Sequence, residues 1–212
     1  MSSCKGSDSG KISEGIITYD LTYPYLKDSF MQGMMPKKLT MEFKNNVYKN
    51  SIESAMFGTS LVSFCEDSSL LFMMHFGKKY YYAELDAALK DSTISINPVP
   101  DIVDLKTTDS LAGFLCHKYM GVFDNLEDGY DGEIYETKDI DIKNSNWCNP
   151  FDELEGVLLG YEINQFGLQM RFRATEVKDT VVSDSVFMVP PNYKKVSLER
   201  ILFELEEISK AL

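Results

Sequence analysis

Basic side chains are scarce in this sequence. Lysine and arginine together number 21 against 33 aspartates and glutamates, so the formal net charge is -12 at pH 7. A charge of this sign repels phosphate backbones, and a nucleic acid is therefore not an expected partner. Apolar runs long enough to cross a bilayer as a helix are also missing, so membrane attachment would need another device.

Motifs of common enzymes and metal sites are absent too. The patterns G-x-S-x-G, H-E-x-x-H and G-x-x-x-x-G-K-[ST] do not occur. Cys116 and His117 are adjacent, but neighbouring residues of a strand point to opposite faces and cannot form a catalytic pair. The acidic stretch DNLEDGYDGE fails the EF-hand pattern at Leu126 and Tyr135 and suits a solvated turn, leaving room only for a weak calcium site of another kind. We expect no enzymatic activity, no metal site and no cofactor.

A cysteine stands close to the start of the chain. The letters SSC before and at Cys4 resemble the end of a bacterial lipoprotein signal, in which small residues precede the cysteine that becomes lipidated. The polar stretch KGSDSGKISE that follows has Ile12 as its only apolar residue, so it suits a flexible tether. We interpret residues 1–13 as lipidation-site remnant and tether, and 14–212 as a single domain. An ordinary disordered start with an incidental cysteine is the alternative.

Three further cysteines, Cys65, Cys116 and Cys148, show no C-x-x-C spacing. Neither a zinc site nor a thioredoxin-type redox pair is therefore indicated. If the chain is exported, a disulfide between Cys116 and Cys148 is allowed, because the compartment is oxidising. Buried free thiols are the alternative reading.

Alternation with a period of two dominates the pattern of apolar residues. GIITYDLTYP predicts a half-buried strand, and KLTMEFKNNVYKNSI predicts a hairpin that turns at Asn45 and Asn46. SLVSFCEDSSLLFMMHFGKKYYYAEL predicts three more strands, with turns at Glu66 to Ser69 and at Gly77 to Lys79. FGLQMRFRAT alternates most cleanly, and its apolar face must be covered by something.

Helices are few in the predicted fold. VSLERILFELEEISKAL has Ser197 as N-cap, Val196 and Ile201 placed as a hydrophobic staple, and an apolar stripe, which predicts an amphipathic C-terminal helix. AELDAALKD and LKDSFMQGMMP are shorter helix candidates. The expected fold class is α+β: a strongly curved antiparallel sheet of roughly nine to eleven strands forms an unclosed half-barrel, with a few helices as a lid.

Several segments resemble a known family. EGIITYDLTYP, DSLAGFLCHKYMGVF, GEIYETKDI, NPFDELEGVLLGYEI and VFMVPPNYKKVSLERI occur in the order seen in exported Gram-negative lipoproteins of uncharacterised function. These look like relatives of the periplasmic lipoprotein carrier and receptor proteins. The resemblance implies an unclosed antiparallel barrel that covers an apolar cavity under a helical lid. It carries over no catalytic or binding residue.

Methionine is abundant, with eleven residues in the chain. Thioethers are flexible and adapt to ligands of variable shape, which suits a cavity for acyl chains, although gap-filling in a large core explains them as well. We expect the lid to carry Met31, Met34 and Met35. We expect the cavity wall to carry Phe166, Leu168, Met170 and Phe172.

Two functions follow from these observations. The first is a non-enzymatic, membrane-anchored carrier or sensor that holds a lipid or other hydrophobic small molecule in an apolar cavity. The second is an interaction module whose interior is filled and whose acidic surface docks a protein partner. Both fit an exported outer-membrane lipoprotein that faces the periplasm or the cell surface.

Overall fold

The computed structural model describes residues 10–27, 32–33, 35–54, 57–85, 99–123, 131–165 and 168–211. For 131, 164–165, 168 and 208–211 it describes the backbone alone. The strands are β1 (Glu14–Thr22), β2 (Lys38–Lys44), β3 (Val47–Glu53), β4 (Phe57–Phe64), β5 (Ser69–Phe76), β6 (Lys79–Leu85), β7 (Asp101–Leu111), β8 (Phe114–Val122), β9 (Asp131–Thr137), β10 (Val157–Gln165), β11 (Leu168–Asp179) and β12 (Lys194–Lys195). The 3-10 helix η1 spans Asp184–Phe187, and the α-helix α3 spans Leu198–Ala211.

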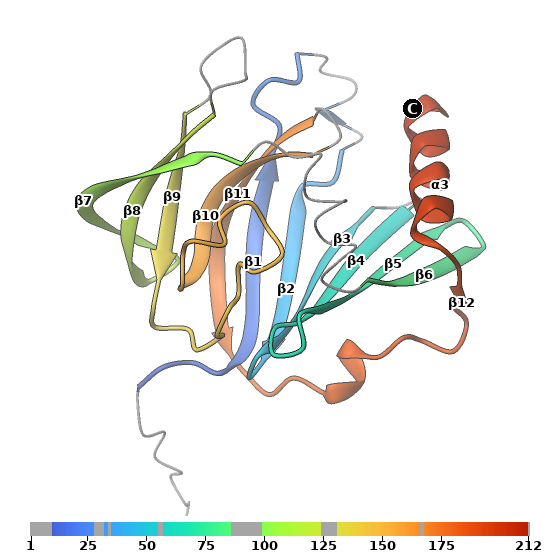
Figure 1. Cartoon of the computed structure of the whole chain (residues 1–212), viewed down its shortest axis with the longest axis horizontal. Helices are drawn as coiled ribbons and strands as arrows, with labels where there is room; N and C mark the ends of the chain where they lie inside the picture. Colours follow the sequence, from blue (N-terminus) through green and yellow to red (C-terminus); the bar gives the residue numbers. More distant parts are fainter. Residues whose placement is uncertain are drawn as a thin grey trace, which may run out of the picture.

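All twelve strands belong to one open sheet (Figure 1). Its order is β12-β6-β5-β4-β3-β2-β1-β11-β10-β9-β8-β7, so β1 lies near the middle and the two edges stay unpaired with each other. Neighbouring strands are antiparallel except β12, which pairs in parallel with β6. The unclosed, curved sheet was predicted correctly.

The α+β class with a few helices as a lid was wrong. The protein is mostly β, and α3 is the one complete α-helix in the part of the chain that the structure describes. AELDAALKD was predicted as a helix, but its first residues, Ala83 to Leu85, end strand β6 because Ala83 and Leu85 are buried on one side of the sheet. None of the described helices is long and apolar enough to cross a membrane.

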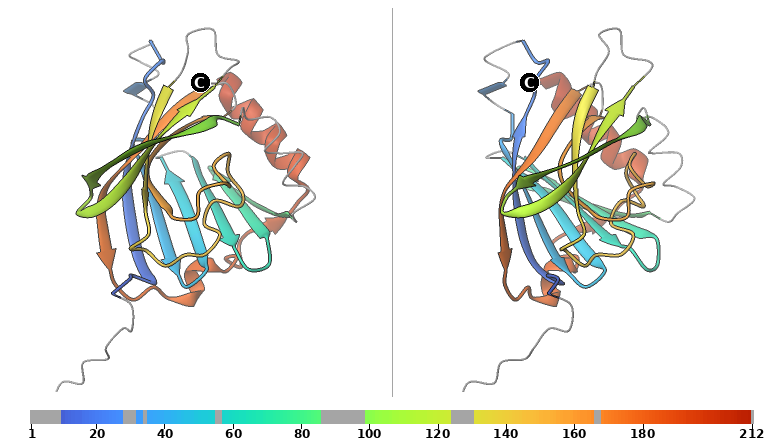
Figure 2. Two further views of the ribbon diagram at one scale, coloured as in Figure 1. Left: turned by 60° about the vertical axis from the view of Figure 1, so that its left-hand side comes forward. Right: turned by 90° about the vertical axis from the view of Figure 1, so that its left-hand side faces the viewer.

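The sheet bends into a trough, and the segment 138–156 between β9 and β10 crosses its inside (Figure 2). Ile140, Ile142 and Trp147 of this segment are buried in the main core cluster together with Ile17 and Phe43 of the sheet. Burial of these side chains supplies the covering that the alternating strands require. We call residues 138–156 the inner loop.

A different segment covers the outer face of the sheet. Met73 contacts the cluster of Val182 and Phe187, which come from the segment between β11 and β12. The next residue, Met74, contacts Ile201 of α3 instead. Since adjacent strand residues point to opposite faces, the segment with η1 packs outside and α3 packs inside the trough.

Several local predictions were confirmed. The hairpin turns at Asn45 and Asn46, and Asn45 has a φ of 52°, a left-handed conformation that asparagine tolerates. α3 begins after Ser197, whose side chain accepts a hydrogen bond from the main-chain nitrogen of Arg200. Val196 packs against the cluster that contains Ile201, as a hydrophobic staple requires.

Ile12 is attached to the fold although it was assigned to the tether. It forms a parallel β-bridge with Ile140 of the inner loop, and its nitrogen donates to the oxygen of Asp139 at 2.9 Å. Its side chain packs against the main core. The packed part of the chain therefore includes the end of the region 1–13.

Candidate functional site

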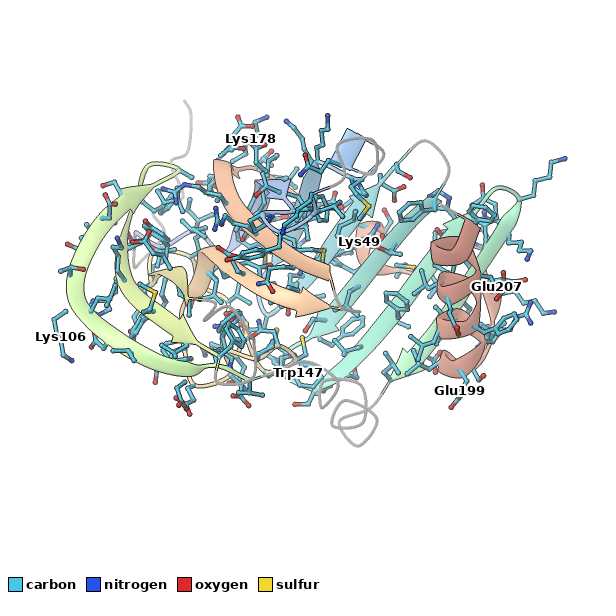
Figure 3. All side chains as sticks on the ribbon, turned by 90° about the horizontal axis from the view of Figure 1, so that it is seen from above. Lys49, Lys106, Trp147, Lys178, Glu199 and Glu207 are labelled. Atoms are coloured by element: carbon cyan, nitrogen blue, oxygen red, sulfur yellow. The ribbon has the colours of Figure 1, made fainter. Side chains whose placement is uncertain are left out.

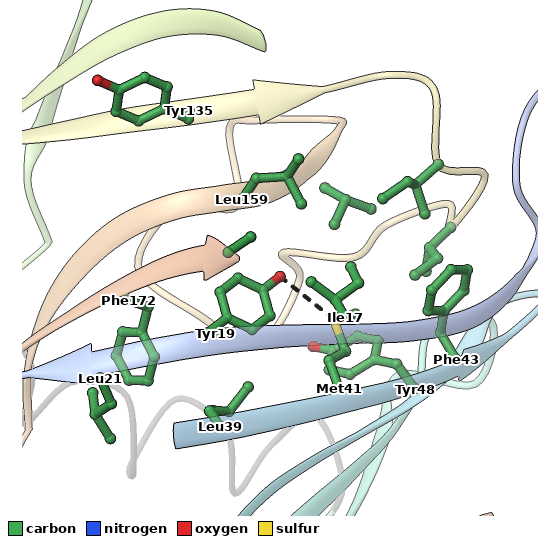
Figure 4. Packing of buried hydrophobic residues seen from close by; sticks show 14 of the residues in the cluster. Ile17, Tyr19, Leu21, Leu39, Met41, Phe43, Tyr48, Tyr135, Leu159 and Phe172 are labelled. Atoms are coloured by element: carbon green, nitrogen blue, oxygen red, sulfur yellow. Dashed lines mark hydrogen bonds between the residues drawn. The ribbon is translucent and has the colours of Figure 1, made fainter. Parts of the chain in front are cut away.

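The inside of the trough is filled by side chains. Ile17, Phe43 and Leu159 are fully buried, and Tyr19 is 2% exposed (Figure 4). A cavity of about 30 Å³ remains, lined among others by Tyr48 and Asn50. Small-molecule sites in proteins have volumes of roughly 300–1,000 Å³. This cavity of about 30 Å³ is too small for an acyl chain.

The residues predicted for wall and lid lie partly in this core. Met170 is 8% and Phe172 is 3% exposed, and the half-buried Met35 packs against the cluster that contains both. Phe172 stacks on Tyr161 of β10, with ring centroids 4.8 Å apart. These three side chains are brought together, but as core packing. Met31, Met34 and Phe166 lie outside the described residues, and Leu168 is described by its backbone alone.

An open pocket of 660 Å³ lies beside these residues, at the end of β1, β2 and β11. Its size falls in the range of small-molecule sites. We call it the Arg171 pocket. Its lining consists of Asp20, Leu21, Thr22, Tyr23, Pro24, Gln32, Lys37, Lys38 and Arg171.

Strand register brings the charged side chains of the pocket together. Asp20 of β1 is opposite Lys38 of β2, and Thr22 of β1 is opposite Arg171 of β11. All four side chains are exposed, because their strand neighbours Leu21 and Phe172 point into the core. The outer side of the sheet thus carries a polar row at this end.

The pocket is locally basic on an acidic protein. Lys37, Lys38 and Arg171 face a single carboxylate among the lining residues, that of Asp20, while the whole chain carries a net charge of -12. Neither Lys37 nor Lys38 forms an ion pair with an acidic side chain in the described ranges. Both lysines are exposed and line the pocket.

Arg171 is held in place by a buried acid. Its Nε donates to Oε1 of Glu162 at 2.5 Å, and the Glu162 side chain is only 4% exposed. Oε2 of Glu162 and the neighbouring Nε2 of Gln169 are buried without a hydrogen-bond partner among the described residues. Burial raises the pKa of Glu162, and the guanidinium of Arg171 counteracts this. The Arg171 side chain is half exposed and lines the pocket.

Tyr23 fixes the floor of the pocket. Its hydroxyl donates to the main-chain oxygen of Pro36 at 2.8 Å, and the nitrogen of Leu21 donates to the oxygen of Lys37 at 2.9 Å. These bonds clamp the end of β1 to the residues that lead into β2. Burial raises the pKa of Tyr23 to about 12, so its hydroxyl stays protonated and keeps donating at neutral pH.

Other polar clusters lack the parts of an active site. Nε2 of His117 lies 2.6 Å from Oδ1 of Asp104, and Nε2 of His75 lies 2.9 Å from Oε2 of Glu53. Lys106 and His117 hold the pKa of Asp104 well below its usual range. Neither pair is in contact with a serine or cysteine nucleophile through a hydrogen bond in the described ranges, and no described group of three acidic, histidine or cysteine side chains could hold a metal ion.

The disulfide between Cys116 and Cys148, allowed by the sequence alongside buried thiols, is not present in this structure. No disulfide joins any of Cys65, Cys116 and Cys148 in the structure. Cys116 directs its sulfur to the main-chain oxygen of Phe114, 3.6 Å away, at the turn between β7 and β8. Cys148 lies in the inner loop near Cys65, where its sulfur is 4.0 Å from Oγ of Ser63.

Comparisons with known proteins show similarity of fold. No protein-family model and no curated protein matches the chain. Two structures of PNGF-II, in space groups P21 and C2, superpose with TM-scores of 0.58 and 0.51 at 11% and 12% sequence identity. The matches cover 91% and 88% of this chain but 33% and 31% of PNGF-II. The chain thus spans about a third of the length of that protein, and at this identity the fold alone is shared.

Proposed function

We propose that the protein is a non-enzymatic binding protein that holds an amphiphile with an acidic head group in the Arg171 pocket. The observation that carries the proposal is an open pocket of 660 Å³ in which Lys37 and Lys38 have no ion-pair partner within the described structure. A simple fatty acid is the model ligand. The lipoprotein anchor at Cys4, which lies outside the described residues, belongs to the same proposal.

The head group would lie between the cations. Arg171 is oriented by Glu162, so its guanidinium presents a fixed donor edge, and the lysines add two mobile positive charges. A carboxylate or phosphate oxygen is the matching acceptor. Asp20 limits the net positive charge and disfavours a ligand with a second acidic group next to its first.

The apolar part of the ligand would lie over Leu21, Tyr23 and Pro24 and continue outside the protein. The filled trough supports this arrangement, in contrast to a chain enclosed in the core. Each methylene removed from water contributes about 0.8 kcal/mol, but a chain that leaves a bilayer for the pocket gains little of this. Head-group contacts at exposed charges contribute roughly 1 kcal/mol or less each. The binding is thus weak enough to release the ligand again.

Paired ligands test the proposal. Dodecanoate and dodecanol have the same chain and differ in the head group, so binding of both is measured by native mass spectrometry and calorimetry. We expect dodecanoate to bind and dodecanol to bind more weakly. Lys38→Gln and Arg171→Gln should each weaken dodecanoate binding about fivefold, since each removes one charge. Equal affinity for acid and alcohol contradicts the proposal.

Lys178→Gln is the matched control. Lys178 lies in the same strand β11, at its far end, and is labelled in Figure 3. Its Nζ pairs with Glu176 at 3.1 Å. Loss of this charge changes the net charge of the protein as much as Arg171→Gln does, so a general electrostatic effect would weaken binding in both variants. A specific site is weakened in Arg171→Gln alone.

A docking module is the second candidate, and the filled interior supports it. The similarity to a third of PNGF-II supports it further, because this fold is there one part of a longer chain. A docking module binds neither amphiphile in the paired measurement. Its surface is then sought by cross-linking with a purified partner, in which case the acidic outer strands are expected to react.

A further inference from the structure

Two cysteine thiols lie close to one buried hydroxyl, that of Ser63. Cys65 begins the turn between β4 and β5, and Cys148 lies in the inner loop. We infer that Cys65 and Cys148 form a disulfide under oxidising conditions and so attach the inner loop to the sheet. This inference is independent of the ligand proposed above.

Ser63 places the two sulfurs in each other's neighbourhood. Its Oγ, fully buried, lies 3.7 Å from Sγ of Cys65 and 4.0 Å from Sγ of Cys148. The same oxygen accepts a hydrogen bond of 2.8 Å from Nε1 of Trp147. Trp147 therefore anchors the residue next to Cys148 directly against β4.

Backbone structure at both cysteines allows the sulfurs to approach. Residues 65–68 and 143–148 are turns and belong to no strand, although the nitrogen of Cys65 donates to the oxygen of Asn46 at 3.0 Å. A disulfide needs Cα atoms about 4.4–6.8 Å apart and rotamers that point at each other. To meet it, the Cys148 sulfur must leave the Tyr48 hydroxyl, which lies 3.2 Å away, and both sulfurs must leave Ser63.

Cys116 is the less suitable partner. Its sulfur points to the oxygen of Phe114, and it is fully buried at the opposite end of the strand order, in β8. β8 is separated from β4 by six intervening strands of the sheet order. The sequence alone could not rank Cys65 above Cys116, because this ranking depends on where the inner loop enters the trough.

The chemistry is two thiol–disulfide exchanges with a small disulfide such as oxidised glutathione. The thiolate of Cys148, which is half-buried and more accessible, attacks one glutathione sulfur and releases one glutathione thiolate. The thiolate of Cys65 then attacks the Cys148 sulfur and releases the second. Two protein thiols are oxidised, one glutathione disulfide is reduced, and the two protons end on the released glutathiones.

Burial makes the second exchange slow at neutral pH. It raises the pKa of Cys65 to about 11, so little thiolate is present near pH 7. The reaction should therefore accelerate with rising pH. In the cell, the disulfide would form most readily during folding, before the inner loop has packed against β4.

The experiment uses the full chain with Cys4→Ser, so that the three remaining cysteines can be distinguished. The protein is incubated with oxidised glutathione at pH 8.5, alkylated, and analysed by intact mass and peptide mapping. We expect loss of two hydrogens, a cross-linked peptide pair of Cys65 and Cys148, and alkylation of Cys116 alone. The melting temperature should rise by roughly 5 °C or more and return after reduction.

Single variants make the outcome decisive. Cys65→Ser and Cys148→Ser should each abolish the cross-link and the rise in melting temperature, while Cys116→Ser should keep both. Circular dichroism of the reduced proteins confirms that each variant is folded. Alkylation of both Cys65 and Cys148 after oxidation overturns the inference, and so does a cross-link that contains Cys116.

Discussion

The hydroxyl of Tyr19 in β1 donates to the main-chain oxygen of Leu158 in β10, 2.9 Å away. β11 lies between these two strands in the sheet, so the tyrosine reaches across a whole strand inside the trough. Leu158 sits where the pairing of β10 with β9 shifts register before Gly160. A single side chain thus satisfies a carbonyl that the bulge turns away from the ladder.

Tyr19→Phe should lower the free energy of unfolding by about 1–3 kcal/mol. The variant keeps the ring but leaves the buried oxygen of Leu158 without this donor. Urea unfolding measures the difference. Tyr81→Phe is the control, since the Tyr81 hydroxyl has no hydrogen bond within the described ranges. A loss of similar size in both variants would assign the effect to the hydroxyl as such and not to the Leu158 contact.

Glu162→Gln should stabilise the protein at pH 7 and lose this advantage as the pH falls toward 4. Burial raises the pKa of Glu162, so the charged form is penalised in the folded state. Wild-type stability therefore gains as the pH drops through the raised folded-state pKa, until the unfolded glutamate is protonated too. Glutamine does not titrate, so in the Glu162→Gln variant residue 162 makes no pH-dependent contribution to stability.

Thermal unfolding at several pH values measures this difference for Glu162→Gln. Glu155→Gln is the control, because Glu155 is 85% exposed and its ion pair with Lys138 lies in solvent. A Glu162→Gln protein less stable than wild type at pH 7 would show that the contact with Arg171 outweighs the cost of burial.

Ser197→Ala should destabilise the first turn of α3. Oγ of Ser197 accepts from the nitrogen of Arg200 at 3.4 Å, and removal of an N-cap side chain costs about 1 kcal/mol. Hydrogen exchange of the α3 amides measures the local effect, which should be larger than the change in β1. Ser197→Asp should restore protection. Unchanged exchange in Ser197→Ala would mean that packing of Ile201 alone holds the helix.

Cys4→Ala should release the protein from the membrane fraction of a Gram-negative host when the chain is expressed behind a complete lipoprotein signal. On the lipobox interpretation, a thioether at Cys4 attaches the chain to the lipid, and one or more acyl chains supply the affinity. Fractionation followed by immunoblotting measures it. Retention of the variant in membranes would contradict the lipobox interpretation, and Cys65→Ala serves as the unaffected control.

Local features of the fold could be predicted from the sequence because each depends on a few neighbouring residues. The hairpin at Asn45 and the cap at Ser197 follow from turn and capping chemistry. Within the predicted helix 83–91, the described residues Ala83 to Leu85 form a strand instead, because burial against the sheet outweighs the helix propensity of alanine. Residues 86–91 lie outside the described residues. Cover for the alternating face of β11 was expected from helices, whereas the inner loop supplies it with Trp147 and its neighbours.

The candidate site could not be predicted from the sequence because it depends on pairing between strands that are far apart along the chain. Arg171 was visibly on the outward side of its strand, yet nothing local indicated that Thr22 would be its cross-strand neighbour. Lys37 and Lys38 likewise read as ordinary solvated charges. Met170 and Phe172 were correctly placed on the apolar face, but the sequence could not tell a filled core from an open cavity.

β1 is synthesised before the other eleven strands, but in the folded protein it lies near the middle of the sheet, between β2 and β11. It can pair with β2 at once, whereas its other neighbour, β11, ends only at Asp179. Until then Ile17 and Tyr19 belong to a strand with an open edge, which is a template for association with other chains. A chain still being synthesised is therefore prone to aggregate through the open edge of β1. A chain that terminates before β11 would lack a central strand of the sheet, whereas loss of an edge strand would leave the central pairing intact.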